Sequence, residues 1–125
     1  MAILIKTDAE IQKMRRSGEA LREVHEAVRP LVVAGASTMD LENAAVAKME
    51  ALKAESAFRG YHGYPAVLCT SVNSEVVHGI PSATRVLQDG DIISIDCGVI
   101  VDGFYSDCAV TYAVGSRGVA RRRHT

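Results

Sequence analysis

The sequence has no tryptophan, and it contains only three prolines and three cysteines in 125 residues. It also has almost no net charge, because 14 basic residues stand against 15 acidic ones. This balance gives no reason to expect a nucleic-acid or membrane partner. The cysteines, Cys69, Cys97 and Cys108, are odd in number and lack CxxC spacing. We therefore expect reduced thiols rather than a disulfide framework or a zinc knuckle.

Long hydrophobic runs are absent as well. No stretch approaches the roughly 20 apolar residues of a membrane span, and the first thirty residues lack the pattern of a secretion signal. We therefore expect a cytoplasmic protein. Because 48% of the residues are apolar, the chain can form one domain with a hydrophobic core. We place this domain at residues 1–115 and interpret residues 116–125, with their arginine run, as a disordered basic tail.

Two amphipathic helices are predicted in the first half. Thr7 and Glu10 form a capping-box pattern, and apolar residues then recur at steps of three and four until Pro30 and Gly35 limit the helix. The predicted face contains Ile11, Met14, Gly18, Leu21, His25, Val28 and Val32. On it we interpret His25 as a packed, hydrogen-bonded core residue rather than a ligand. The second helix is expected from Ser37 to near Ala54, with Leu41, Ala45, Lys48 or Met49, and Leu52 on its packed side.

Strand patterns dominate the second half. Residues 66–71 form a short apolar run between turn formers, which suits a buried strand. Residues 91–114 contain two β-type runs on either side of Asp102 and Gly103, which predicts a hairpin. The predicted fold class is therefore α+β, with two amphipathic helices packed on an antiparallel sheet.

The hairpin contains two aspartates that parity places on one face. If Asp102 and Gly103 are the two central turn residues, Gly98 pairs with Asp107, and Asp96 becomes the diagonal neighbour of Asp107. Two converging carboxylates repel each other, and bound divalent ions would remove that conflict. Gly98 would leave room for such a site. The residues alone also allow hydrogen-bonded strand aspartates at a bulge, or a protonated pair.

Four motifs that follow one another along the chain indicate a protein family. Residues 60–65 (GYHGYP), 71–81 (SVNSEVVHGIP), 89–96 (DGDIISID) and 102–107 (DGFYSD) closely resemble type I methionine aminopeptidase. The resemblance covers essentially residues 6–115. It implies half of a pita-bread (creatinase/aminopeptidase) fold, in which two similar α/β halves enclose a dinuclear metal centre.

The resemblance also implies roles for individual residues. Asp96 and Asp107 match two ligands of a centre that holds two divalent ions (Co, Mn, Fe or Zn), and His78 matches a histidine that stabilises the transition state. The residues that match the pocket for the methionine side chain, or lie beside it, are Phe58, Tyr61, His62, Tyr64 and Cys69. An apolar slot edged by aromatics and sulfur suits that side chain. For the tyrosines, ordinary core packing is the alternative reading from the residues alone.

The remaining family ligands, one histidine and two glutamates, have no counterpart after Gly115. We therefore expect a truncated form of a metal-dependent enzyme that removes N-terminal methionine from peptides and nascent proteins, a form whose own activity is in doubt. A homodimer or a complementing second half would close the site. The alternative is a catalytically impaired pita-bread fragment that acts as a binding or dimerisation module. A prolidase-like peptidase fits residues 61–65 less well.

Overall fold

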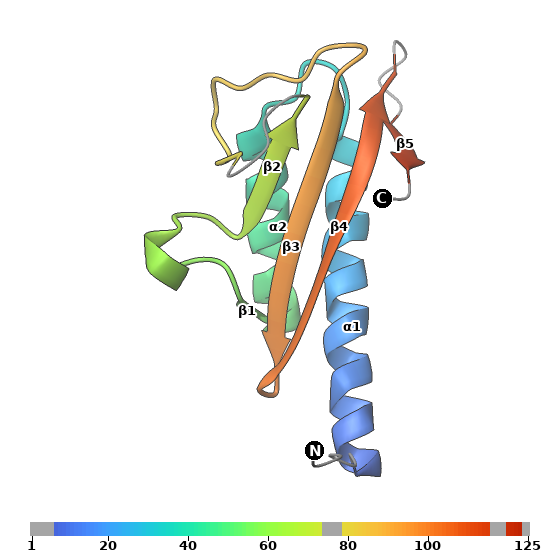
Figure 1. Ribbon diagram of the computed structural model, residues 1–125, viewed down its shortest axis with the longest axis vertical. Helices are drawn as coiled ribbons and strands as arrows, with labels where there is room; N and C mark the ends of the chain where they lie inside the picture. The colour runs from blue at the N-terminus through green and yellow to red at the C-terminus, as the bar shows by residue number, and fades with distance from the viewer. Residues whose placement is uncertain (1–6, 74–78, 116–119, 124–125) are drawn as a thin grey trace, which may run out of the picture.

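A computed structural model of the chain describes residues 7–73, 79–115 and 120–123. It has two layers, with two helices on one face of an antiparallel sheet (Figure 1). This is the predicted α+β arrangement. None of the helices in the described part of the chain has the length and apolar character needed to cross a bilayer.

Helix α1 runs over Asp8–Val28 and begins as predicted. The Thr7 side chain accepts a hydrogen bond from the Glu10 backbone N–H, and the Glu10 carboxylate accepts one from the Thr7 backbone N–H. The helix gives way to a short 3-10 turn, η1 (Arg29–Leu31), which contains Pro30. Proline lacks the N–H that a continuing α-helix would need.

The predicted face of α1 is exposed in its first half and buried in its second. Ile11 and Met14 are 39% and 44% exposed, because the first turns of α1 extend past the end of the sheet (Figure 1). Farther along, the buried side chains are Ser17, Ala20, Leu21, Val24, His25 and Val28. Periodicity identifies a helix face, but it does not tell how far the partner layer extends beneath it.

Helix α2 covers Thr38–Leu52 and has a second capping box, formed by Ser37 and Asp40. It ends at Lys53, whose left-handed conformation (φ 55°) terminates the helical hydrogen bonding. The side chains of Leu41, Ala45 and Met49 are buried. Met49, rather than its neighbour Lys48, therefore continues the packed face.

Strand β3 is the centre of the sheet. Strand β4 pairs along the whole of one edge of β3, and β1 and β2 follow one another along its other edge. The fifth strand, β5, pairs with β4. The strands are β1 (Glu55–Ser56), β2 (Leu68–Val72), β3 (Ile92–Val101), β4 (Phe104–Val114) and β5 (Ala120–Arg123).

Strand β5 lies within the segment expected to be a disordered tail. Its pairing with β4 extends from Val114↔Ala120 to Thr111↔Arg123. Residues 120–123 thus form an edge strand of the sheet. The physical reason is that the free edge of β4 presents unpaired backbone groups, which a returning chain can satisfy. The charge of this segment and its lack of periodicity do not reveal that such an edge is available.

The two faces of the sheet differ in what covers them. Alternate residues of β3, including Ile93, Ile95 and Val99, are fully buried against the helices and form the centre of the core. The opposite face, which we term the open face, has no helix over it in the described structure (Figure 1). By register it contains Cys69, Ser71, Ser94, Asp96, Gly98, Asp107, Ala109 and Thr111.

Candidate metal centre and side-chain pocket

The β3–β4 hairpin has the predicted turn and register. Asp102 and Gly103 have φ values of 50° and 80°, as a two-residue type I′ turn requires. Val101 pairs with Phe104, and Gly98 pairs with Asp107. Asp96 is therefore the diagonal neighbour of Asp107 on the open face, and the parity prediction is confirmed.

The two carboxylates influence each other. Asp96 is half-buried and Asp107 is exposed. Burial, followed by the Asp107 carboxylate, raises the pKa of Asp96, while His25 and the backbone N–H of Cys97 oppose the rise. Negative charge at Asp96 is thus unfavourable unless a cation compensates it.

This conflict predicts a pH-dependent stability effect. Between the unfolded and the raised folded pKa of Asp96, the folded chain binds more protons, so its free energy of unfolding falls as the pH rises through that window. Without metal at pH 7, Asp96→Asn should therefore stabilise the chain, on the order of 0.5 kcal/mol for a like-charge diagonal pair. The gain should vanish below the ordinary aspartate pKa, where both proteins are neutral at this position.

Urea unfolding at pH 7 and at pH 3 measures this effect. Asp107→Asn serves as the second variant and should act in the same direction, because it removes the repelling carboxylate. An Asp96→Asn protein that is less stable than the parent at pH 7 without metal would contradict the electrostatic account.

Helix α1 anchors β4 on both sides of Asp107. The Ser106 hydroxyl donates to the Ser17 carbonyl over 3.0 Å, and Nε2 of His25 lies 3.0 Å from the Cys108 carbonyl oxygen. A carbonyl can only accept, so this ring nitrogen carries the proton. His25 is 7% exposed, which confirms its interpretation as a hydrogen-bonded core residue. The helix therefore holds the backbone from which Asp107 projects.

Phe58 covers the glycine that pairs with Asp107. A Cβ atom on Gly98 would lie 2.9 Å from Phe58 Cε1 and 3.1 Å from Ala57 Cβ. The Ala57 backbone N–H also donates to the Gly98 carbonyl over 3.0 Å. The space expected above Gly98 for a metal site is thus occupied by an aromatic wall. The Phe58 ring consequently lies next to the Gly98–Asp107 pair.

Tyr64 and Cys69 form a second wall on the open face. Cys69 pairs directly with Asp96, and the Tyr64 hydroxyl donates to the Leu68 carbonyl over 2.8 Å. Burial, followed by Cys69 and the carboxylates of Glu42 and Asp96, raises the pKa of Tyr64 well above its usual value. Tyr64 therefore keeps its proton and remains a hydrogen-bond donor.

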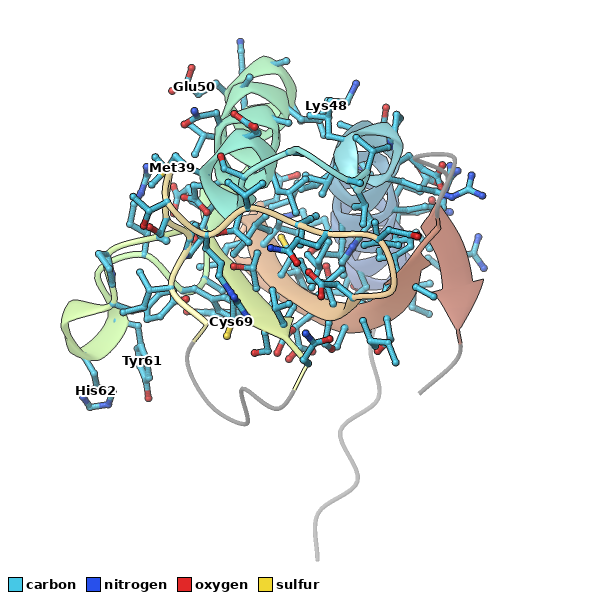
Figure 2. All side chains as sticks on the ribbon, turned by 90° about the horizontal axis from the view of Figure 1, so that it is seen from above. Met39, Lys48, Glu50, Tyr61, His62 and Cys69 are labelled. Atoms are coloured by element: carbon cyan, nitrogen blue, oxygen red, sulfur yellow. The ribbon has the colours of Figure 1, made fainter. Side chains whose placement is uncertain are left out.

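The other predicted pocket residues lie farther out. Tyr61 and His62 belong to the short 3-10 segment η2 (Tyr61–Gly63), and their rings meet edge-on with centroids 4.3 Å apart. Tyr61 is 68% exposed. Figure 2 shows both side chains extending away from the helix layer, beyond the edge of the sheet near which Cys69 lies. His78 falls outside the described residues.

Gly79, which follows His78 in the chain, is pressed against β2. Its carbonyl accepts hydrogen bonds from the Thr70 backbone N–H (2.7 Å) and from the Thr70 hydroxyl (3.0 Å). A Cβ atom at this glycine would lie 1.9 Å from the Thr70 carbonyl oxygen. Position 79 therefore needs glycine for this close backbone approach.

The donor chemistry of the aspartate pair fits divalent ions. Carboxylate oxygens bind ions such as Mn²⁺, and a cation between the pair would relieve the repulsion that raises the pKa of Asp96. Within residues 7–73, 79–115 and 120–123, no three His, Cys, Asp or Glu side chains gather as a metal-binding group. Asp96 and Asp107 alone would fill only part of a coordination shell.

Glu42 carries a buried carboxylate that no sequence motif indicated. It lies on the buried side of α2 and is 6% exposed. Its carboxylate accepts hydrogen bonds from the backbone N–H groups of Val67 (2.8 Å) and Leu68 (3.0 Å). One signal was present, because Glu42 stands beside Leu41 and three residues before Ala45 on the packed face. Glutamate is rarely buried without a partner.

Known proteins are similar to this chain in both sequence and geometry. Residues 12–125 match the family model of metallopeptidase family M24. The chain therefore belongs to metallopeptidase family M24. It is 45% identical over 113 residues to methionine aminopeptidase from Clostridium acetobutylicum, and 43% identical over 126 residues to that from Escherichia coli K12. These alignments cover 90% and 98% of this chain.

Solved structures agree with the sequence relatives. Methionine aminopeptidase from Thermotoga maritima superposes with a TM-score of 0.85 at 43% identity, covering 91% of this chain and 46% of that one. Aminopeptidase P from Escherichia coli, at 21% identity and a TM-score of 0.69, shares the fold. The architecture is thus that of half a pita-bread fold, as expected. The chain spans about half the length of the curated relatives that it matches, 45% and 47% of the two named above.

Proposed function

We propose that this chain supplies one half of a methionine aminopeptidase centre, which removes the N-terminal methionine from peptides and nascent proteins. The observation that carries the proposal is the placement of Asp96 and Asp107 on the open face, beside the walls formed by Phe58, Tyr64 and Cys69. A carboxylate pair beside aromatic and thiol side chains would combine hydrolytic chemistry with side-chain selection.

Each residue has a defined part in this proposal. Two divalent ions, when bound, would polarise the scissile carbonyl and lower the pKa of the attacking water. Asp96 and Asp107 would hold these ions. His78, which lies outside the described residues, would donate to the oxygen that gains negative charge. The methionine side chain would lie against Phe58, Tyr64 and Cys69, with Tyr61 and His62 at the rim.

A complete metal centre needs further ligand atoms besides those of Asp96 and Asp107. We propose a second half or a second copy of the chain as their source, placed over the open face. The fold is built on two similar halves, so a copy related by a two-fold axis would bring a second aspartate pair to the centre.

A metal titration joined to a peptide assay tests the proposed activity. Metal-free protein is titrated with Mn(II) or Co(II) in a calorimeter, and release of methionine from a Met-Ala-Ser peptide is then followed. We expect saturable metal binding and turnover that depends on the metal. Leu-Ala-Ser serves as the control peptide and should be cleaved more slowly. Binding without turnover under every condition would contradict enzymatic activity of this chain alone.

The second candidate is a binding or dimerisation module. Two features of the described residues favour it: no helix lies over the open face, and no third His, Cys, Asp or Glu joins the aspartate pair. Sedimentation of the same samples with and without Mn(II) separates the two. A dimer that forms without metal and has no turnover supports the module. A dimer that requires metal and cleaves the peptide supports the aminopeptidase.

A further inference from the structure

The Glu42 carboxylate joins α2 to the start of β2. Each of its oxygens accepts one backbone N–H, from Leu68 to Oε1 at 3.0 Å and from Val67 to Oε2 at 2.8 Å. Val67 and Leu68 are both fully buried, so no water competes for these N–H groups. Hydrogen bonds that involve an ionised group are roughly twice as strong as neutral ones. Successive N–H groups that converge on one anion also define a local bend of the backbone.

The hydrogen bonds from Val67 and Leu68 to Glu42, which we term the clamp, hold the backbone next to Tyr64 and Cys69. The backbone of Leu68 is held on both sides, because its N–H donates to Glu42 and its carbonyl accepts from the Tyr64 hydroxyl. Cys69 follows immediately and pairs with Asp96. The position of Tyr64 and Cys69 relative to Asp96 is therefore set at this one residue.

The two hydrogen bonds of the clamp lie at the end of a gap in the sheet. Along this edge of β3, β1 ends at Ser56 and β2 begins at Leu68, and η2 lies between them. The segment that carries Phe58 and Tyr64 thus leaves the sheet and returns to it at Leu68. Glu42 reaches this point of return from the helix layer.

We propose that Glu42 is a positioning residue for the methionine pocket, acting by holding the Val67–Leu68 backbone so that Tyr64 and Cys69 stand beside Asp96. This inference rests on the proposed aminopeptidase function, because the pocket is defined by that function. The clamp itself is independent of catalysis and can be measured without substrate.

Glu42→Gln tests the clamp with little change of shape. One carboxylate oxygen is replaced by an NH₂ group that cannot accept, and the charge is lost. Amide hydrogen exchange at Val67 and Leu68 should accelerate by about 10- to 100-fold, as expected for losing a charge-assisted bond. Glu50→Gln, an exposed change on the same helix, should leave both amides unchanged. Unchanged protection in Glu42→Gln would overturn the proposal.

Cys69 reports whether loss of the clamp reaches the pocket. Thiol modification is followed by peptide mass spectrometry, with exposed Cys108 as the internal reference. We expect the Cys69 rate, relative to Cys108, to change several-fold in Glu42→Gln and to stay constant in Glu50→Gln. Loss of amide protection with an unchanged Cys69 rate would reduce Glu42 to a purely structural role and contradict the positioning claim.

Glu42→Asp is the second variant, in case the glutamine protein does not fold. It keeps the carboxylate, so its amide protection and its Cys69 rate should lie between those of Glu42→Gln and those of the parent. If the glutamine protein does not fold, both readouts in Glu42→Asp should differ from the parent by more than they do in Glu50→Gln. An aspartate variant indistinguishable from Glu50→Gln in both readouts would overturn the clamp.

Activity separates this inference from the proposed function. Where the parent protein cleaves Met-Ala-Ser, Glu42→Gln should raise KM about 10-fold, leave kcat within about 2-fold and leave Mn(II) affinity unchanged, since a positioned pocket acts through binding. If the parent has no metal-dependent turnover, the proposed function fails. The exchange and thiol measurements then still decide whether Glu42 holds the pocket wall.

Discussion

Asp107→Asn and Asp96→Asn should each weaken Mn(II) binding by more than about 100-fold, because the loss of a direct ligand exceeds the 10- to 100-fold effect typical of residues behind the ligands. An amide oxygen is a neutral donor, so it provides much less attraction for a divalent ion than a carboxylate. The two aspartates occupy diagonal positions on the open face, and each variant leaves one of them in place. Isothermal titration of the metal-free proteins measures the change.

Asp102→Asn is the matched control for this prediction. It is the same substitution on the same hairpin, and asparagine suits the left-handed turn position of residue 102 (φ 50°). The change removes an exposed ion pair with Arg16 at 3.1 Å, which contributes at most about 1 kcal/mol. Its metal affinity should match that of the parent. Equal losses in all three variants would mean that binding depends on general negative charge, and would contradict a site at the aspartate pair.

Gly79→Ala should lower the free energy of unfolding by about 2–3 kcal/mol, the upper range for inserting atoms into a packed interior. The added Cβ would lie 1.9 Å from the Thr70 carbonyl oxygen and 2.4 Å from its carbon, and both are backbone atoms of a strand. Relief therefore requires Gly79 to move away, which breaks its two hydrogen bonds with Thr70. Because His78 is the preceding residue, turnover in the proposed reaction should fall as well.

Gly18→Ala provides the opposite result with the same chemical change. Gly18 is an exposed residue within α1, and a Cβ there meets nothing within 4 Å. Alanine should therefore stabilise the chain by about 0.5–1 kcal/mol through helix propensity. Urea unfolding of both variants, with equal m-values, gives the comparison. A Gly79→Ala protein as stable as the parent would show that the close approach of residue 79 to β2 is absent in solution.

The hairpin was predictable because its information is local. A two-residue turn with Asp and Gly selects one turn type, and that turn sets the pairing of every residue along both strands. The capping boxes of α1 and α2 are local for the same reason, since each joins residues three positions apart. The relation between Asp96 and Asp107 follows from such local rules.

Contacts between segments that are far apart in the sequence could not be predicted from local patterns. Glu42 meets Val67 and Leu68 across 25 and 26 residues, and Phe58 rests on Gly98 across an even longer separation. The sequence alone left the space above Gly98 open for a metal, because nothing local indicates that a ring returns to cover it. Strand β5 was missed because its partner edge on β4 exists only once the sheet has formed.

By itself, the sequence determined the helix starts, the hairpin register and the shared face of the aspartate pair, since turn chemistry and side-chain alternation act over a few residues. The resemblance in its motifs also identified the family. Only the tertiary structure decided which turns of α1 are buried, that Phe58 covers Gly98, and that a buried glutamate holds the backbone of the pocket. Those features depend on where packed layers end and on which distant backbone groups lack a partner, and both are settled only when the helices meet the sheet.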